Sequence, residues 1–332
     1  MSDVTAVDQA AGKRAVPSGA APARRWFQGR PGGQPQRIRR WLAPLPWLLP
    51  STALIAVVVV WPIVTLVQTS TENINPLGLV QGSNGAKNFG DLFANPNLPG
   101  ILVRTVIWVV AIVAITMLIS LGLAQLFNQR FPGRRVARWA LIAPWAASVI
   151  MTALIFRWML DPDNGVINVF LHQLGLVQFN ASGASWLGRP DAAMAWMIAV
   201  AVFVSLPFTT YALLAGLQTI PGELFEAARV DGASRWQSYR RITLPLLRPA
   251  FFVALLINVM NVFNSFPIIW GMTRGGPGYA TNTTTVFMYN LKTSFVGQAA
   301  AMSIVNFALI VVIILFFLWV NNRNRSMGTE AR

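Results

Sequence analysis

The sequence contains no cysteine, one histidine and eleven acidic residues. The lack of cysteine excludes disulfides, thiolate catalysis and cysteine-ligated metals within this polypeptide. Charged residues make up 11% of the chain and hydrophobic residues 55%, which leaves too little polar surface to cover a soluble globule of this size. The composition therefore predicts an integral membrane protein.

The positive charge has two interpretations. A formal net charge of +15 would suggest nucleic-acid binding in a soluble chain. Here the arginines lie beside long apolar runs, and positive residues that flank spanning helices remain on the cytoplasmic side of a membrane. We therefore interpret the charge as a signal of membrane orientation, and expect membrane lipid and not nucleic acid around this chain.

Several apolar runs are long enough to cross about 30 Å of hydrocarbon as helices. The predicted fold class is accordingly an all-α polytopic membrane protein with six transmembrane helices. These helices are expected at residues 46–70, 101–127, 137–160, 192–219, 248–270 and 299–320.

The predicted domains follow from these runs. Residues 1–40 lack apolar periodicity and are rich in Ala, Gly, Pro, Gln and Arg, which favours a disordered, uncleaved basic tail. Residues 41–322 form the transmembrane domain and residues 323–332 a second tail. Arginines gather in both tails and after the second and fourth runs, so the positive-inside rule places both termini in the cytoplasm. On the outer side, a short amphipathic helix is expected at Val166–Leu176, along the interface.

A polar, Arg-rich segment at residues 221–245 follows the fourth run. Pro221 suits the first turn of a short helix that extends to about residue 230. The dipeptide Asp231-Gly232 should end this helix, because glycine permits backbone angles that other residues resist.

A second short helix is expected directly afterwards. Ser234 followed three residues later by Gln237 predicts a capping box at its start, and Pro245 should end it, with the fifth spanning helix beginning near Arg248. Two short helices joined at a glycine would form a rigid protrusion on the cytoplasmic face. An ordinary amphipathic interfacial loop would explain the arginines but not this order of residues.

The same segment carries a family resemblance. Its residues Glu226-Ala227-Ala228, Gly232 and Ile242-x-Leu244-Pro245 resemble the EAA motif of permease subunits in bacterial binding-protein-dependent ABC importers. Motifs such as Gly275-Gly276-Pro277 are similar to the MalF-like half of maltose-type carbohydrate permeases. The resemblance covers roughly residues 45–320.

The resemblance implies a type I ABC importer permease fold in a bacterial inner membrane, with cytoplasmic coupling helices. It also implies several partners: a homologous MalG-like permease subunit, a dimer of ATP-binding subunits and an extracytoplasmic solute-binding protein. ATP and Mg²⁺ would be bound by the ATPase, and no cofactor is expected on this chain. The residues that would contact the ATPase are Glu226, Ala227, Ala228, Asp231, Gly232, Ala233, Ile242, Leu244 and Pro245.

The sequence also indicates that nucleotide is bound by another chain. It lacks the Gly-x-x-x-x-Gly-Lys-Ser/Thr loop that cradles nucleotide phosphates. The lysines Lys13, Lys87 and Lys292 have no such context.

Polar residues in the fifth helix indicate a solute pathway. Asn258, Asn261, Val262 and Ser265 fall on one helical stripe, with Asn264 beside it, and polar groups inside a membrane favour the bundle interior. By resemblance to maltose-type permeases, these residues would line a sugar cavity together with Ala201, Val204, Ser205 and Phe208. Bonding between helices is an equal alternative for the asparagines, and packing is the simpler role for Phe208.

Two rival functions remain at this stage. A membrane-embedded enzyme would need acids, bases or metal ligands, yet the acidic residues lie outside the predicted helix cores, and His172 lies in the outer amphipathic segment. A proton-driven transporter would need a titratable group at mid-membrane, whereas sodium coupling through carbonyls and hydroxyls stays open. We therefore predict an importer permease for a sugar, oligosaccharide, polyol or glycerophosphate-like solute. The alternatives are a sodium-coupled secondary transporter and, less favoured, an enzyme.

Overall fold

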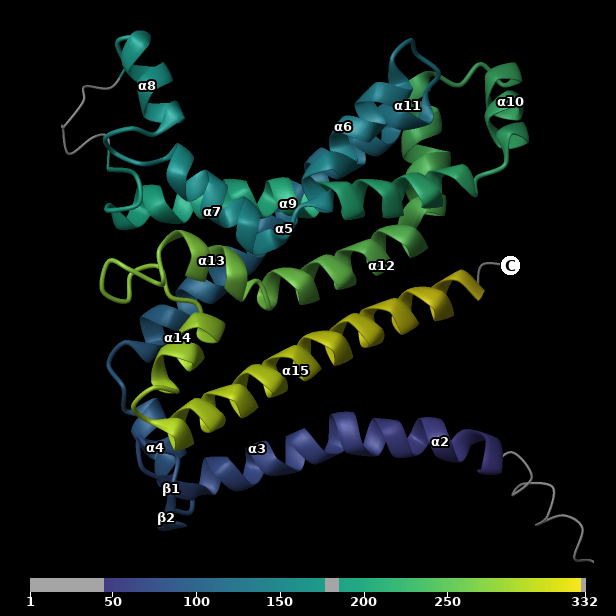
Figure 1. The fold of residues 1–332 in the computed structure, drawn as a ribbon. Helices are drawn as coiled ribbons and strands as arrows, with labels where there is room; N and C mark the ends of the chain where they lie inside the picture. The colour runs from purple at the N-terminus through teal and green to yellow at the C-terminus, as the bar shows by residue number, and fades with distance from the viewer. Residues whose placement is uncertain (1–44, 177–184, 330–332) are drawn as a thin grey trace, which may run out of the picture. The chain divides into compact units, whose positions relative to one another are not determined.

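The computed structural model describes residues 45–176 and 185–329, so the predicted tail at residues 1–40 lies outside the described residues. The chain divides into two compact units, Met1–Val58 and Val59–Arg332. The described part of the first unit contains α2 (Leu45–Ile55) and the start of a π-helical turn, Ala56–Val60. Figure 1 labels the helices and strands, and those of the second unit are described next.

The second unit is mostly helical. It begins with α3 (Trp61–Thr71), a small antiparallel hairpin of β1 (Glu72–Ile74) and β2 (Val80–Ser83), and α4 (Lys87–Phe93). Its further helices are α5 (Leu98–Asn128), α6 (Arg134–Ala146), α7 (Val149–Met159), α8 (Val166–Gln173), α9 (Pro190–Gln218), α10 (Gly222–Val230), α11 (Arg235–Ser238), the π-helical turn η3 (Tyr239–Thr243), α12 (Leu244–Phe263), α13 (Phe266–Met272), α14 (Thr284–Leu291) and α15 (Val296–Thr329).

Long apolar helices confirm the predicted fold class. Within the described residues, five helical stretches are long and apolar enough to cross a membrane, or six if one bent pair counts as a span. The five stretches are Trp47–Thr71, Leu98–Asn128, Pro190–Gln218, Arg235–Phe263 and Val296–Val320. The predicted short helix near Val166–Leu176 is also present, as α8.

The prediction of one continuous helix at 137–160 is wrong. The chain forms α6 and α7 there, bent by 96° to one another. Ala147 and Ser148 between them have extended backbone angles. Pro144 lies in the last turn of α6, and because proline has no N–H to donate, it weakens the helix just before this break.

The fifth predicted helix also differs from expectation at both ends. The helix runs without interruption from Arg235 to Phe263, so Pro245 does not end it. The π-helical turn before the proline makes this possible: the Leu244 N–H donates to the carbonyl of Tyr239, five residues back, in place of the usual four. At the other end, the helix stops at Phe263 and α13 begins at Phe266, which interrupts the predicted run 248–270.

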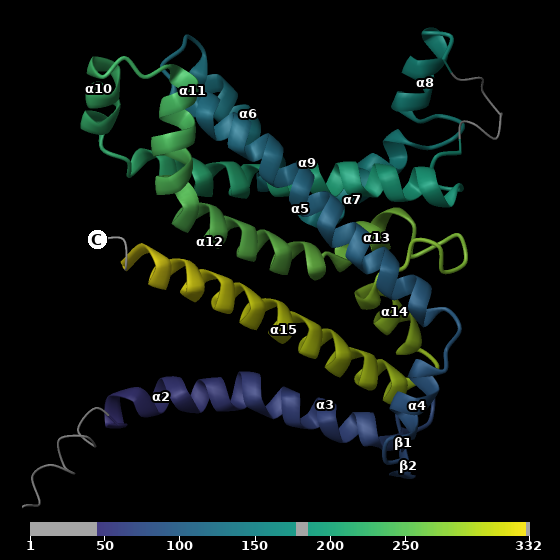
Figure 2. The same cartoon turned by 180° about the vertical axis from the view of Figure 1, so that it is seen from behind.

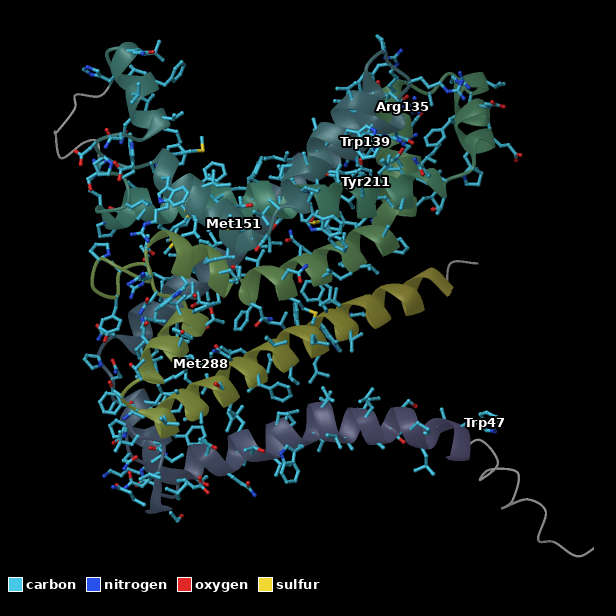
Figure 3. All side chains as sticks on the ribbon, viewed as in Figure 1. Trp47, Arg135, Trp139, Met151, Tyr211 and Met288 are labelled. Carbon is cyan, nitrogen blue, oxygen red and sulfur yellow. The ribbon has the colours of Figure 1, made fainter. Side chains whose placement is uncertain are left out.

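The core of the second unit lies where α5, α9 and α12 pack together, and both views show α5 crossing α9 (Figures 1 and 2). Trp108, Met197, Leu213 and Leu247 are almost fully buried in it. The hydroxyl of Tyr211 on α9 donates to the carbonyl of Arg138 on α6, at 3.2 Å (Figure 3). This bond anchors α6 to the bundle near its N-terminal end.

A second hydrophobic cluster joins α4, α14 and the first turns of α15. It buries Leu92, Phe287 and Met302, and Ser303 of α15 donates to the sulfur of Met288 of α14 at 2.8 Å (Figure 3). Asn88 of α4 donates to the carbonyls of Ser70 and Glu72, each at 2.9 Å. These contacts hold the hairpin and α4 against the start of the last long helix.

Candidate functional site

A cavity of about 430 Å³ lies between α9, α12 and the two helix breaks. It brings together every residue that the sequence predicted for the solute pathway. These are Ala201, Val204, Ser205 and Phe208 from α9, Asn258, Asn261 and Val262 from the end of α12, and Asn264 and Ser265 directly after it.

The end of α12 is fixed by local hydrogen bonds. The side-chain amide of Asn264 donates to the carbonyl of Met260 at 3.1 Å, and the Ser265 hydroxyl donates to the carbonyl of Val262 at 2.7 Å. The indole N–H of Trp108 on α5 reaches the same carbonyl of Val262 at 3.2 Å. Both carbonyls also accept a backbone N–H, from Asn264 and Ser265 respectively, each at 3.2 Å. The side chains therefore add second hydrogen bonds at this helix end, and they keep Ser265 at the cavity although it lies outside α12.

Asn258 has an unusual environment. Its side chain is only 2% exposed, yet its Nδ2 has no hydrogen-bond partner among the described residues. A buried amide without a partner costs about 1–3 kcal/mol, so the protein gains no stability from this donor as it stands. The structure therefore gives no support to a bond from Nδ2 to another helix, which was the alternative role.

Helix α9 contributes the opposite wall. Ala201 is 1% exposed, and Phe208 is half-buried at the cavity. The Thr209 hydroxyl donates back to the carbonyl of Ser205 at 3.0 Å. Pro207 is accommodated inside α9, which is a single helix.

Sequence reasoning missed five lining residues: Trp145, Val149, Thr209, Pro267 and Ile268. Trp145 and Val149 lie on either side of the break between α6 and α7, so they reach the cavity only because the helix bends there. The neighbouring Pro144 was the signal in the sequence that the helix could break at this point. The stretch from Ser265 to Ile268 lines the cavity because the chain turns from α12 into α13.

A larger hollow of about 620 Å³ lies along α5, α12 and α15, but its chemistry is different. Its lining is hydrophobic apart from Thr105 and Thr284. The Thr105 hydroxyl already accepts the Thr284 N–H at 3.0 Å. This hollow has the character of a surface that faces lipid or another helix, and it offers little to a polar solute.

The segment 221–245 has the predicted local structure in its first part. Helix α10 is followed by Gly232, whose φ of +74° few other residues adopt readily. The predicted capping box is confirmed: the Gln237 N–H donates to the Ser234 hydroxyl at 3.3 Å, and the Ser234 N–H to the Gln237 side chain at 2.8 Å.

The residues predicted to contact an ATPase divide between exposed and covered positions. Exposed are Glu226, Ala227, Asp231, Gly232 and Pro245, whereas Ala233, Ile242 and Leu244 are half-buried and Ala228 is buried. The Glu226 carboxylate lies 4.0 Å from the Arg229 guanidinium, and the Glu226 side chain is 72% exposed. Such an exposed pair contributes little stability, so Glu226 is available for an external contact.

The described residues offer no comparable catalytic or metal centre. No group of three or more His, Asp or Glu side chains in them could hold a metal ion. His172 lies in α8, away from the cavity lining.

Comparison with known proteins places the chain in a family. Residues 116–328 match the family described as binding-protein-dependent transport system inner membrane component. A probable ABC transporter permease protein of Brucella suis is 39% identical over 83% of this chain and 96% of its own length. The trehalose/maltose transport system permease protein MalF of Thermococcus litoralis is 36% identical over 64% of this chain and 71% of its own length.

A solved structure shares the fold. A bacterial ABC transporter involved in the import of the acidic polysaccharide alginate superposes with a TM-score of 0.75 at 24% identity, over 87% of this chain and 98% of that one. Family membership also decides against the enzyme alternative, because members of this family are transport proteins. The chain belongs to the binding-protein-dependent transport system inner membrane components, and is a multi-pass permease subunit of an ATP-driven ABC importer.

Proposed function

We propose that this permease passes a neutral, polyhydroxylated solute of the sugar, oligosaccharide or polyol class through the cavity between α9 and α12. The observation that carries the proposal is the lining itself. Asn258, Asn261 and Asn264 bring carboxamides, Ser205 and Ser265 bring hydroxyls, and no lining side chain carries a charge.

The chemistry of the lining suits a neutral solute. Carboxamides both donate and accept hydrogen bonds, as sugar hydroxyls do, and Phe208 and Trp145 provide apolar faces for a sugar ring. Asn258 has a buried donor free to bind such a hydroxyl. The similarity to a trehalose/maltose permease supports the same class. A glycerophosphate-like solute would need cationic groups, which this lining does not supply.

Segment 221–245 is proposed as the site of ATPase coupling. Glu226 and Ala227 are exposed on α10, while the capping box fixes the start of the helix that continues unbroken into the cavity wall at Asn258. A push on α10 would thus pass through the turn at Gly232 into a single helix, Arg235–Phe263, that ends at the cavity. The continuity of this helix supports mechanical coupling between segment 221–245 and the cavity.

We further propose that both termini and segment 221–245 face the cytoplasm, and that a homologous second permease completes the pathway. The orientation rests on arginines such as Arg229, Arg235 and Arg240 in this segment. The second subunit is supported by the resemblance to the MalF-like half, and by hydrophobic faces on α5 and α15 that this chain leaves exposed.

The test is reconstitution in proteoliposomes with the ATPase, binding protein and second permease co-expressed from neighbouring genes. ATP-dependent uptake of a neutral sugar or polyol, with no uptake of glycerol 3-phosphate, is expected. Co-purification without any ATPase would contradict the coupling role, and uptake restricted to anionic solutes would contradict the proposed substrate class.

A further inference from the structure

A second polar pocket, of about 300 Å³, lies between the end of α5 and segment 221–245. Gln125 comes from α5 and Gln129 directly follows that helix, while Arg229 comes from α10, and Arg235, Ser238 and Tyr239 come from the start of the long fifth helix. The solute pathway shares no residue with it. Its lining is also of a different kind, because it contains two arginines beside neutral hydrogen-bonding residues.

The positive charge of this pocket is largely uncompensated. No acidic residue lines it. Arg229 has the distant, exposed pair with Glu226, at 4.0 Å, and a weak 3.4 Å bond to the Phe225 carbonyl. Arg235 has no acceptor or ion pair among the described residues. Both side chains are therefore available to an anion.

A neutral donor in the pocket also lacks a partner. The Nε2 of Gln125 is buried without a hydrogen-bond partner among the described residues. Leaving such a donor unpaired is unfavourable, and a ligand in the pocket would satisfy it. Ser238 and Tyr239 add hydroxyls that can donate in the same way. One buried amide donor, two half-buried hydroxyl residues and two exposed guanidinium groups in one pocket match an oxyanion with several acceptor oxygens.

On α10, the pocket lies on a different face from the exposed residues proposed to contact the ATPase. Beyond α10, the half-buried Ala233 belongs to both sets. Phe225 and Arg229 are four residues apart, so they share one face and line the pocket. Glu226 and Val230 lie roughly 100° further around the helix and are strongly exposed. The ATPase and a pocket ligand can therefore contact α10 together.

We propose that this pocket binds a phosphate group, held by Arg229 and Arg235 with the Gln125 amide. Guanidinium groups are preferred for phosphate because their paired N–H donors match its oxygens. The group can come from a free phosphate compound or from an anionic phospholipid headgroup, which share this chemistry. A bound phosphate would tie α10 and α11 to α5. Its effect on transport rests on the proposed coupling role, but its binding does not.

The test uses the chain's four tyrosines. The full chain, labelled with 3-fluorotyrosine, is placed in phosphatidylcholine nanodiscs and observed by ¹⁹F NMR, with Tyr239→Phe to assign the Tyr239 signal. Tyr211, Tyr279 and Tyr289 do not line the pocket, so their signals report whether the fold is intact. One arm titrates inorganic phosphate, and the other replaces part of the lipid with phosphatidylglycerol.

We expect the Tyr239 signal to shift selectively in one arm or both, and the arm that responds identifies the source of the phosphate. Arg235→Gln and Arg229→Gln should each weaken the apparent affinity about tenfold, as expected for the loss of a charged hydrogen bond. The exposed Arg240→Gln, which lies outside the pocket, should have no such effect. No Tyr239 shift in either arm, or a shift unchanged in the Arg229→Gln/Arg235→Gln double variant, would overturn the proposal. Because the measurement needs neither ATPase nor transport, its failure is separate from failure of the proposed function.

Discussion

The indole Nε1 of Trp108 lies 2.9 Å from the hydroxyl oxygen of Ser265. This contact joins the middle of α5 to the break between α12 and α13. Because Ser265 lines the cavity, the bond ties one wall of the proposed solute pathway to the core. Trp108 is 1% exposed, so its N–H is shielded from water and depends on these protein acceptors.

Trp108→Phe removes this donor and keeps an aromatic ring in the core. We expect the free energy of unfolding to fall by about 1–2 kcal/mol, together with slower uptake, because the break would be held less firmly. Thermal unfolding followed by intrinsic tryptophan fluorescence measures the first effect. Trp158→Phe is the matched control, since Trp158 on α7 is 70% exposed. Equal losses in both variants would show that the hydrogen bond has no special role.

Asn258→Leu separates the two roles that the sequence left open for this residue. If Asn258 serves a solute, the substitution should reduce uptake by about tenfold, the value of one good hydrogen bond. Stability should stay equal or rise, because an unpaired buried amide has been removed. Asn264→Leu is the comparison, since its Nδ2 holds the carbonyl of Met260 and its loss should lower stability. A clear destabilisation by Asn258→Leu would instead favour a structural role.

Gly232→Val and Gly232→Asn test the turn after α10. An added Cβ would meet nothing within 4 Å, so only the backbone angle, φ +74°, opposes a side chain here. Asparagine tolerates this region far better than the β-branched valine. We expect Gly232→Val to lower solute transported per ATP by about fivefold, which corresponds to about 1 kcal/mol, and Gly232→Asn to stay near wild type. The measurement is uptake and ATP hydrolysis in the same proteoliposomes. An equal amount of solute transported per ATP in the two variants would contradict a role of this turn in coupling.

Ser234→Ala tests the confirmed capping box. Loss of the hydroxyl should destabilise the start of the fifth helix by about 1 kcal/mol. The amide of Gln237 should then exchange its hydrogen faster, which hydrogen exchange with mass spectrometry detects. Ser234→Asp should preserve protection, because aspartate also caps well. Unchanged exchange in Ser234→Ala would mean that the cap contributes nothing in the membrane.

Much of this architecture could be predicted because it depends on composition and local chemistry. Spanning helices follow from the length of apolar runs, and the Ser234 cap follows from two residues three positions apart. The cavity residues on α9 and α12 were found because helical spacing places them on common faces. The resemblance to maltose-type permeases indicated which faces to choose.

What could not be predicted depends on tertiary context. Hydropathy measures how long a run is, not whether it bends, so the break at Ala147 and Ser148 was hidden inside one apolar run. Pro245 was expected to end a helix, but the π-helical turn before it removes the need for its missing N–H. Trp145 reaches the cavity only as a result of the bend. The neighbouring Pro144 indicates that the helix weakens there, but not which way the chain turns.

Gly216→Ala tests the close contact between α9 and α12, the two helices that precede and follow most of segment 221–245. A Cβ on Gly216 of α9 would lie 2.3 Å from the Cβ of Ala250 and 3.0 Å from a Leu247 methyl of α12. The first contact involves a side chain fixed directly to a helix backbone, so the two helices must separate. Segment 221–245 lies between α9 and α12 in the chain, so separation of these two helices would loosen the segment at both of its ends. We expect a loss of about 1–3 kcal/mol in stability and a larger fractional loss of uptake than of ATP hydrolysis.

Gly122→Ala provides the matched control for this crossing. Gly122 lies in the long helix α5, where an added Cβ would meet nothing within 4 Å. Alanine is the better helix former by about 1 kcal/mol, so this variant should be as stable as the wild type or more so. The difference between the two glycines therefore isolates helix separation from helix propensity. A wild-type ratio of uptake to hydrolysis in Gly216→Ala, despite lowered stability, would show that coupling does not pass through the crossing of α9 and α12.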